Sequence, residues 1–522
     1  MIQLAQIIFI LSVLVILHEF GHYIAAKIFK VRVEKFYLFM DAGFSLFKKK
    51  IGDTEWGIGW LPIGGYVKLS GMIDESMDTE QLKQEPQPWE FRSKPAWQRL
   101  IIMLGGIFVN IVLAITIYAV MFSTVGQKFV SSEKIQKNGL AFGEVGRNVG
   151  FQNGDKIVSV DGKFLPDFKY AVMGILFGDD IILDRNGKEV KLHLTDAQKG
   201  QIIKKEGKNF VQARIELNKI FVDSITDTKK INLKKFDKII GVNDKKFKFY
   251  DEVLLEASKN KNKNINLLIN RNGKDTIIKA KVDKDGDFGG YSVFMNEDYT
   301  LSDMKIKDAM KNKSLKTNDV IVSANEKTTN LELKKQLAEN KGKDVLLKVK
   351  RDNTVIDILS KVNKSGKLGI QFDEIKNSSY LVVNKLSVFE AIKEGANQAW
   401  SQIIYNIDSF KLIFKPATGA YTQVKSPIGI ARMLPNAWDW EFVWSFIALF
   451  SIGLAFMNLL PIPGLDGGHA LFTIVEMVTG KTLSEKAMGN VQTGGMIFLL
   501  SLMALTFGKD IYQWIMETWF VK

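Results

Sequence analysis

The chain has 522 residues, of which 46% are hydrophobic, 25% are charged and none is cysteine. This length allows about three to four domains of about 150 residues each and excludes a single small domain. Without cysteine there can be no disulfide and no Cys-ligated metal or cluster, so any metal must be bound by histidine and carboxylate side chains. The net charge of +14 lies entirely in residues 127–386, which carry 50 basic and 36 acidic side chains.

Four segments outside this basic block are apolar over the roughly 20 residues that a membrane-spanning helix needs. They are residues 4–26, 100–122, 442–465 and 487–508. The first segment contains a few polar side chains, whereas the other three carry no charge. It has neither a basic start nor a small-residue cleavage site, so we interpret it as a retained helix and not as a cleaved signal. The sequence therefore predicts a polytopic α-helical membrane protein with four transmembrane helices.

The basic residues of the short loops predict the orientation. No Lys or Arg precedes the first span, whereas residues 27–99 contain twelve. Because short cytoplasmic loops are enriched in Lys and Arg, this loop is predicted to be cytoplasmic. Both termini and the large basic block should then lie outside the cytoplasm.

Within the cytoplasmic loop, residues 56–71 combine aromatic and β-branched residues with paired glycines, a composition typical of a bent β-hairpin. Because spans flank it and it is apolar, we expect this β-loop, about residues 36–71, to be partly immersed in the membrane. The acidic, proline-containing stretch 74–88 is predicted to be an exposed connector.

The basic middle block contains an internal repeat. Residues 151–162, 233–244 and 315–326 align, and their aspartates Asp155, Asp237 and Asp319 lie 82 residues apart each time. About thirty residues after each aspartate comes a strand with a basic turn. The pattern predicts a tandem of β-rich modules of about 80 residues and resembles PDZ domains of the bacterial protease type. Any tandem of small β-domains would give a similar period, and only the first copy keeps the glycine before its aspartate.

Residues 388–410 show apolar side chains at three- and four-residue spacing, which predicts an amphipathic helix. Such a stripe can pack on a core or lie on a membrane surface.

The expected organisation of the chain follows from these elements. The first two spans are expected in residues 1–126. Three PDZ-like domains follow, at residues 127–210, 211–298 and 299–376. A membrane-surface helix region is expected at 377–440, and the last two spans at 441–522.

The sequence HEFGH, His18–His22, lies inside the first span. Residues i and i+4 of a helix share one face, so His18 and His22 can present two imidazole nitrogens to one ion, with Glu19 beside them. Ionisable groups at membrane depth cost about 2.5 to 3.5 kcal/mol each to insert, so three in one turn are expected to have partners and a function. This segment therefore predicts a metal site.

A hydrolytic metal site needs a third protein ligand and an open position. The charged residue that directly follows the third span is Asp466, in the stretch NLLPIPGLDGGH that ends at His469. Pro461 and Pro463 are expected to break the helix there. His469 is a competing third ligand.

HEFGH and NLLPIPGLDGGH together resemble the motifs of the site-2 proteases, the intramembrane zinc metalloproteases of peptidase family M50, and most closely those of the bacterial regulator-of-sigma-E type. The β-loop and the PDZ-like insert fit the same resemblance, which covers nearly the whole chain, although three PDZ-like domains exceed the usual one or two. The resemblance implies one zinc ion per chain. It also implies these roles: His18, His22 and Asp466 as zinc ligands, Glu19 as catalytic base, Asn458 as a substrate-holding residue, and Gly64, Gly65 and Tyr66 as substrate contacts.

The function implied is hydrolysis of single-pass membrane proteins, such as anti-sigma factors or remnant signal peptides, in the bacterial cytoplasmic (inner) membrane after a site-1 protease has shortened them. The PDZ-like domains would filter these substrates. Two other interpretations are a zinc carrier, in which Glu19 would be a superfluous ligand, and an inactive scaffold, which the complete motifs disfavour. We expect no nucleic-acid partner, because the lysines of the basic block are scattered through amphipathic strands and turns.

Overall fold

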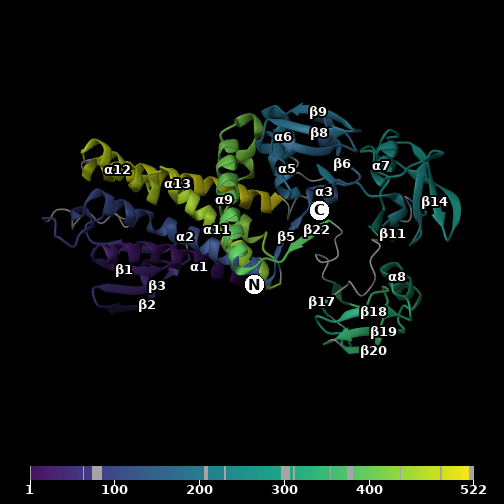
Figure 1. Cartoon of the computed structure of the whole chain (residues 1–522), viewed down its shortest axis with the longest axis horizontal. Coiled ribbons are helices and arrows are strands. Elements are labelled where there is room, and N and C mark those ends of the chain that lie inside the picture. Colours follow the sequence, from purple (N-terminus) through teal and green to yellow (C-terminus); the bar gives the residue numbers. More distant parts are fainter. Residues whose placement is uncertain are drawn as a thin grey trace. The chain divides into compact units, whose positions relative to one another are not determined.

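A computed structural model describes residues 2–62, 64–72, 85–204, 210–227, 231–295, 306–309, 312–352, 354–372, 380–435, 437–481 and 485–516. The chain forms two compact units (Figure 1). The first combines residues 1–127 with 384–522 and contains the apolar helices, and the second, residues 128–383, contains the β-rich modules.

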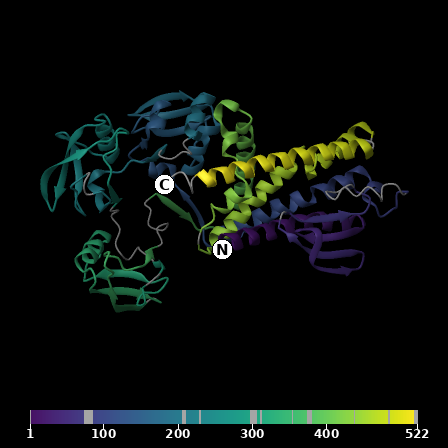
Figure 2. The ribbon, with the colours of Figure 1, turned by 180° about the vertical axis from the view of Figure 1, so that it is seen from behind.

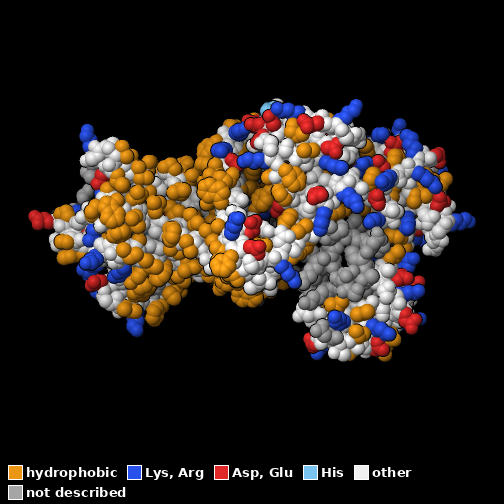
Figure 3. All heavy atoms as spheres, viewed as in Figure 1, with side chains coloured by type: hydrophobic (Ala, Val, Ile, Leu, Met, Phe, Trp, Pro, Cys, Tyr) orange, Lys and Arg blue, Asp and Glu red, His pale blue; other side chains and the backbone are white. Residues whose placement is uncertain are grey.

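Among the described residues, four helices are long and apolar enough to cross a membrane. They are α1 (Ile2–Ile28), α2 (Ala96–Thr124), α11 (Trp440–Leu459) and α13 (Glu485–Ile515). Hydrophobic side chains cover most of the visible surface of this unit (Figure 3). The third span ends at Leu459, six residues earlier than expected, because the proline-containing stretch after it cannot continue the helix. The fourth continues past the expected end as one long helix (Figure 2).

Helices α1, α2 and α11 share one apolar core, in which Ile10, Leu14, Ala114 and Ile447 are buried. Glycines let α1 and α2 approach closely, since a Cβ added to Gly105 would lie 2.6 Å from the Gly21 carbonyl oxygen.

The expected amphipathic helix is α9 (Val388–Ile413), which packs on α2. Its contact face is formed by small residues, among them Ala391, Gly395 and Ala399. Its other face leaves Phe389 86% and Trp400 64% exposed. One side of α9 therefore packs on protein, while the other remains an exposed apolar surface.

Between α1 and α2 the chain forms a four-stranded sheet instead of the expected hairpin. Its strands are β1 (Val33–Leu38), β2 (Met40–Ile51), β3 (Thr54–Leu61) and β4 (Tyr66–Leu69), in the order β2-β3-β1-β4. The two strands of the predicted hairpin, β3 and β4, are thus separated by β1, which is parallel to β3 and antiparallel to β4. The hairpin in this sheet joins β2 to β3. Most of the predicted connector, residues 74–84, lies outside the described residues.

The second unit contains three β-rich modules, each with its own hydrophobic core. The central sheets are β7-β8-β9, β13-β12-β14-β15 and β18-β19-β20. Among the described residues, the first module adds two helices of nine or ten residues, the other two modules add one each, and every module has a short two-stranded ladder. The first ladder pairs β6 with β10 (Val211–Ala213). Strand pairing in the first module therefore continues past residue 210, where the module was expected to end. The expected boundary at residue 298 lies outside the described residues.

The bounds of the remaining elements follow in chain order. In the first module they are α3 (Ser132–Ile135), β6 (Leu140–Phe142), α4 (Glu144–Asn148), β7 (Lys156–Val160), α5 (Phe168–Phe177), β8 (Asp180–Arg185), β9 (Lys188–His193) and α6 (Asp196–Lys204). In the second they are β11 (Ile220–Ile225), β12 (Lys238–Val242), β13 (Lys245–Lys246), α7 (Tyr250–Ser258), β14 (Asn264–Arg271), β15 (Lys274–Lys281) and β16 (Tyr291–Met295). In the third they are β17 (Ile306–Asp308), β18 (Val320–Ala324), α8 (Asn330–Glu339), β19 (Asp344–Arg351), β20 (Thr354–Lys361) and β21 (Gln371–Phe372). The others are β5 (Gln127–Val130), β22 (Leu381–Asn384), α10 (Pro427–Ala431) and α12 (Asp466–Thr479).

The repeated aspartates make the same contact in all three modules. Each carboxylate is buried and accepts two hydrogen bonds from one arginine guanidinium, with shortest distances of 2.7, 2.6 and 2.7 Å. The pairs are Asp155–Arg185, Asp237–Arg271 and Asp319–Arg351. The arginine comes from the strand that precedes the basic turn. The aspartate and the arginine that recur in each repeat therefore form one bidentate ion pair.

Candidate metal and catalytic site

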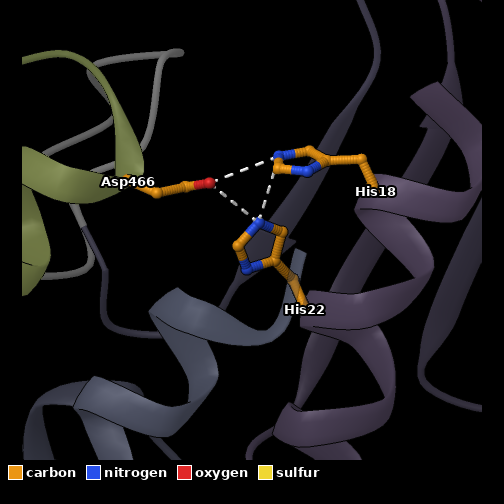
Figure 4. A group of neighbouring side chains, drawn as sticks. All are labelled: His18, His22 and Asp466. Carbon is orange, nitrogen blue, oxygen red and sulfur yellow. Dashed lines mark hydrogen bonds and ion pairs between the residues drawn. The ribbon is translucent and has the colours of Figure 1, made fainter. Parts of the chain in front are cut away.

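About one turn of α1 carries the three ionisable side chains of the HEFGH sequence. His18 and His22 are buried and lie one helical turn apart, with their Nε2 atoms separated by 3.4 Å. Both rings reach this position because side chains at i and i+4 of a helix lie one above the other. The two nitrogens therefore point toward the same small volume (Figure 4).

Asp466 enters this volume from another part of the chain. After α11 the backbone is non-helical through the two prolines and Gly464, whose φ is +93°, and α12 begins at Asp466. A carboxylate in the first turn of a helix is favoured by the helix dipole. The Asp466 Oδ2 lies 3.2 Å from His18 Nε2 and 3.3 Å from His22 Nε2 (Figure 4).

These three atoms form a nearly equilateral triangle that fits zinc. The edges measure 3.2, 3.3 and 3.4 Å. A tetrahedral zinc with bonds of 2.0–2.1 Å requires ligand atoms about 3.3 Å apart. Two imidazoles and one carboxylate are also a donor set that zinc accepts, and three protein ligands leave the fourth position open. The residues present therefore fit one zinc ion.

Helix α2 forms the wall behind the histidine rings. His22 Nδ1 lies 2.8 Å from the carbonyl oxygen of Ile102, which makes Nδ1 the protonated nitrogen and leaves the Nε2 lone pair free for a metal. At Gly106 there is room for both rings only because a side chain is missing. A Cβ there would lie 2.5 Å from His22 Nε2 and 2.6 Å from His18 Cε1.

A cavity of about 520 Å³ opens onto this site. Glu19 and Asn458 line it together with the three candidate ligands, and so do Tyr66, the first residue of β4, and Gly65 just before it. Gly65 packs closely against α1, since a Cβ there would lie 2.6 Å from Val15 Cγ1. Gly64 is not among the described residues that line the cavity.

The structure brings Asn458 closer to the ligands than the sequence suggested. Its Nδ2 lies 3.0 Å from His18 Nε2 and 3.4 Å from Asp466 Oδ2. The competing ligand His469 also lines the cavity, but its Nε2 is 2.5 Å from the side-chain amide of Gln492 on α13. Among the described residues, the group that can hold a metal consists of His18, His22 and Asp466.

Two residues near the site were not identified from the sequence. Asn110 on α2 lies 3.2 Å from His18 Nδ1, and it could have been noticed because it is the one side-chain amide in the uncharged segment 100–122. Asp41 lines the cavity and accepts a hydrogen bond of 3.0 Å from the Tyr66 hydroxyl. No sequence signal distinguishes Asp41 from other loop carboxylates.

Comparison with known proteins connects this geometry to a family. The model of peptidase family M50 matches residues 6–502, a range that includes both parts of the site, all of α2 and α11, and parts of α1 and α13. The chain belongs to peptidase family M50. It is therefore a polytopic membrane protein of the site-2 protease family and a zinc metallopeptidase.

Bacterial relatives carry the names of metalloproteases, and those matched over nearly their full length are named zinc metalloproteases. A Neisseria meningitidis protein is 24% identical over 97% of this M50 chain and 98% of its own length. A Thermotoga maritima protein is 25% identical, with 95% and 96% covered. The Caulobacter vibrioides metalloprotease MmpA is 30% identical over 37% of this chain and 52% of its own length.

Proposed function

We propose that this chain is an intramembrane protease that hydrolyses peptide bonds in or near the transmembrane segment of single-pass membrane proteins. The observation that carries the proposal is the ligand triangle of His18, His22 and Asp466, which joins the apolar helix α1 to the first residue of α12 and opens into a cavity beside Glu19. Carriers and scaffolds do not require an acidic side chain next to an open metal position, whereas hydrolysis does.

The roles of the side chains follow from their positions. His18, His22 and Asp466 would hold one zinc ion, which when bound lowers the pKa of water and polarises a carbonyl. Glu19 accepts the proton of the attacking water and returns it to the leaving amine, because its carboxyl group lines the same cavity. The Asn458 amide lies against the ligands and can also donate a hydrogen bond to a substrate carbonyl at this end of the cavity.

The sheet can present the substrate in an extended form. A helix hides its carbonyls in hydrogen bonds, so a transmembrane substrate must unwind before hydrolysis. Strand β4 is at an edge of its sheet, and all four of its residues, Tyr66–Leu69, line the cavity. An unwound segment can add to this edge as a further strand.

The surroundings of the enzyme are part of the proposal. The active site would face the cytoplasmic side of the bacterial inner membrane, with both termini and the β-rich unit outside. The twelve basic residues of the first loop support this orientation. The sheet and the exposed face of α9 would contact lipid. The three modules would act as PDZ-like domains that admit substrates pre-trimmed by a site-1 protease, such as anti-sigma factors or remnant signal peptides.

A comparison of wild type with Glu19→Gln in proteoliposomes tests the proposed activity. The substrate is a single-pass protein with a short extracytoplasmic tail. Both enzymes should contain about one zinc per chain, and only the wild type should cleave, because an amide preserves shape but cannot accept a proton. Undiminished cleavage by Glu19→Gln would contradict the role of Glu19. Zinc flux into sealed vesicles without cleavage would favour a carrier.

A further inference from the structure

The interior of α2 contains a polar side chain that the catalytic mechanism does not use. Asn110 has no exposed surface, and Ser451 of α11 donates a hydrogen bond of 2.8 Å to its backbone carbonyl. Its side-chain Nδ2 lies 3.2 Å from His18 Nδ1, on the opposite side of the imidazole from the ligand triangle. A buried amide inside a membrane span is costly unless it is hydrogen-bonded, so its partner indicates its purpose.

We propose that Asn110 is a positioning residue of the metal site, and that its amide oxygen holds the His18 ring in the tautomer that can bind zinc. The inference rests on the proposed function, because it takes His18 as a ligand. If His18 Nε2 binds a metal, its lone pair is used there, and the proton of the neutral ring must be on Nδ1. Nδ1 then becomes a donor and requires an acceptor.

The Asn110 amide can supply that acceptor. Its Oδ1 is buried and has no hydrogen-bond partner among the described residues. A half-turn of the amide group keeps its volume and exchanges Oδ1 with Nδ2, so that the oxygen lies about 3.2 Å from His18 Nδ1. The metal-binding tautomer favours this arrangement, since two N–H donors would otherwise face each other.

The position of Asn110 on α2 supports the same role. His22 already receives its orientation from the carbonyl of Ile102, and Gly106 leaves room for both rings. Residues 102, 106 and 110 are spaced by four and therefore lie on one face of the helix. This single face of α2 would then fix both histidine ligands, through a backbone carbonyl for one and a side-chain amide for the other. Such outer partners of ligating histidines set the ring orientation and raise the basicity of the ligand.

Two substitutions of Asn110 separate hydrogen bonding from packing. Asn110→Leu keeps a similar volume but removes the acceptor, whereas Asn110→Asp keeps an acceptor and removes the donor. Ser451→Ala is the matched control, because it removes the hydrogen bond to the Asn110 backbone without touching either histidine. Zinc affinity of the full chain is measured by chelator competition, and the ligand field by the absorption spectrum of the cobalt-substituted protein.

We expect Asn110→Leu to weaken zinc binding about 10- to 100-fold and to alter the cobalt spectrum. Asn110→Asp and Ser451→Ala should stay within a few-fold of wild type and keep its spectrum. Wild-type affinity and spectrum in Asn110→Leu would overturn the inference. If Asn110→Leu does not fold, loss of zinc in a folded Asn110→Asp protein would overturn it, because it would show that the amide acts as a donor. A wild-type chain without zinc would instead refute the proposed function.

Discussion

At Gly106 a single added methyl group would contact both candidate histidine ligands. The Cβ of Gly106→Ala would lie 2.5 Å from His22 Nε2 and 2.6 Å from His18 Cε1, so both rings would have to shift away from the positions in which they face Asp466. We expect this variant to lose most of its zinc and its activity. The control is Gly453→Ala on α11, where no atom lies within 4 Å of the added Cβ. Metal analysis of both purified variants measures the effect, and full zinc content in Gly106→Ala would contradict it.

Asp466 and His469 can be distinguished by the same measurement. Asp466 lies in the ligand triangle, whereas the His469 ring contacts Gln492. Asp466→Ala should therefore lower the zinc content strongly, and His469→Ala should leave it largely intact. The reverse result would assign the third ligand position to His469.

At the residue scale, the sequence was sufficient where spacing along one helix determines contact. The i, i+4 rule placed His18 and His22 on one face without any knowledge of the fold. The position of Asp466 near them depends on where two helices meet. The sequence offered Asp466 as a candidate third ligand beside His469, and only the family resemblance favoured Asp466. Asn110 was missed because its contact with His18 depends on how closely α1 and α2 approach, which the Gly21–Gly105 contact determines.

At the element scale, composition predicted which segments are helices and strands better than it predicted the order of the strands in the sheet. The sequence predicted the apolar helices to within a few residues, except that it extended the third span through two prolines that end it and ended the fourth span seven residues before Ile515. In the sheet, residues 56–71 do contain two strands, but local composition cannot show that β1 lies between them. Strand order depends on pairing between distant residues, and β1 pairs with β3 in a parallel register that no short turn could form.

The buried Asp–Arg pair of each module is expected to contribute to the stability of that module. Asp319 is 1% exposed and bonded to Arg351, so Asp319→Asn leaves the guanidinium without its charged partner. We expect a loss of roughly 3 kcal/mol in the stability of the third module, since breaking a buried pair costs several kcal/mol and Arg351 is partly exposed. Hydrogen exchange of the β18 and β19 amides in the full chain measures this loss. The control is Asp344→Asn, an exposed carboxyl group on β19.

The same pair predicts how the third module responds to acid. Burial alone would raise the pKa of the Asp319 carboxyl, but hydrogen bonds from Arg351 and from the Lys316 backbone outweigh it and hold the pKa below its ordinary value. A carboxyl group with a lowered folded-state pKa stabilises the fold above its unfolded pKa of about 3.9. This stability is lost as the pH falls from there through the folded pKa. After correction for intrinsic exchange rates, Asp319→Asn should lack this part of the acid destabilisation. An unchanged acid response would contradict the assignment.

At the scale of the whole molecule, the site and the β-rich unit are separable in the chain. Every residue that lines the active-site cavity belongs to the apolar unit. The two points where the chain leaves and re-enters this unit are close together, because the Asn384 side chain lies 3.4 Å from that of Gln127. A short Gly/Ser linker can therefore replace residues 128–383 without stretching the unit. The ligand triangle should stay intact, and the shortened enzyme should keep about one zinc per chain.

The shortened enzyme also tests the proposed filter. If the three modules exclude bulky extracytoplasmic domains, their removal should let the enzyme accept substrates that the intact chain rejects. Both enzymes are given one transmembrane segment that carries either a large folded domain or a short tail. We expect the intact chain to cleave only the short form and the shortened chain to cleave both. Glu19→Gln in the shortened chain controls for contaminating proteases. Continued rejection of the large form by an active shortened enzyme would place the size limit in the apolar unit, since the modules would then be absent while the selectivity remained.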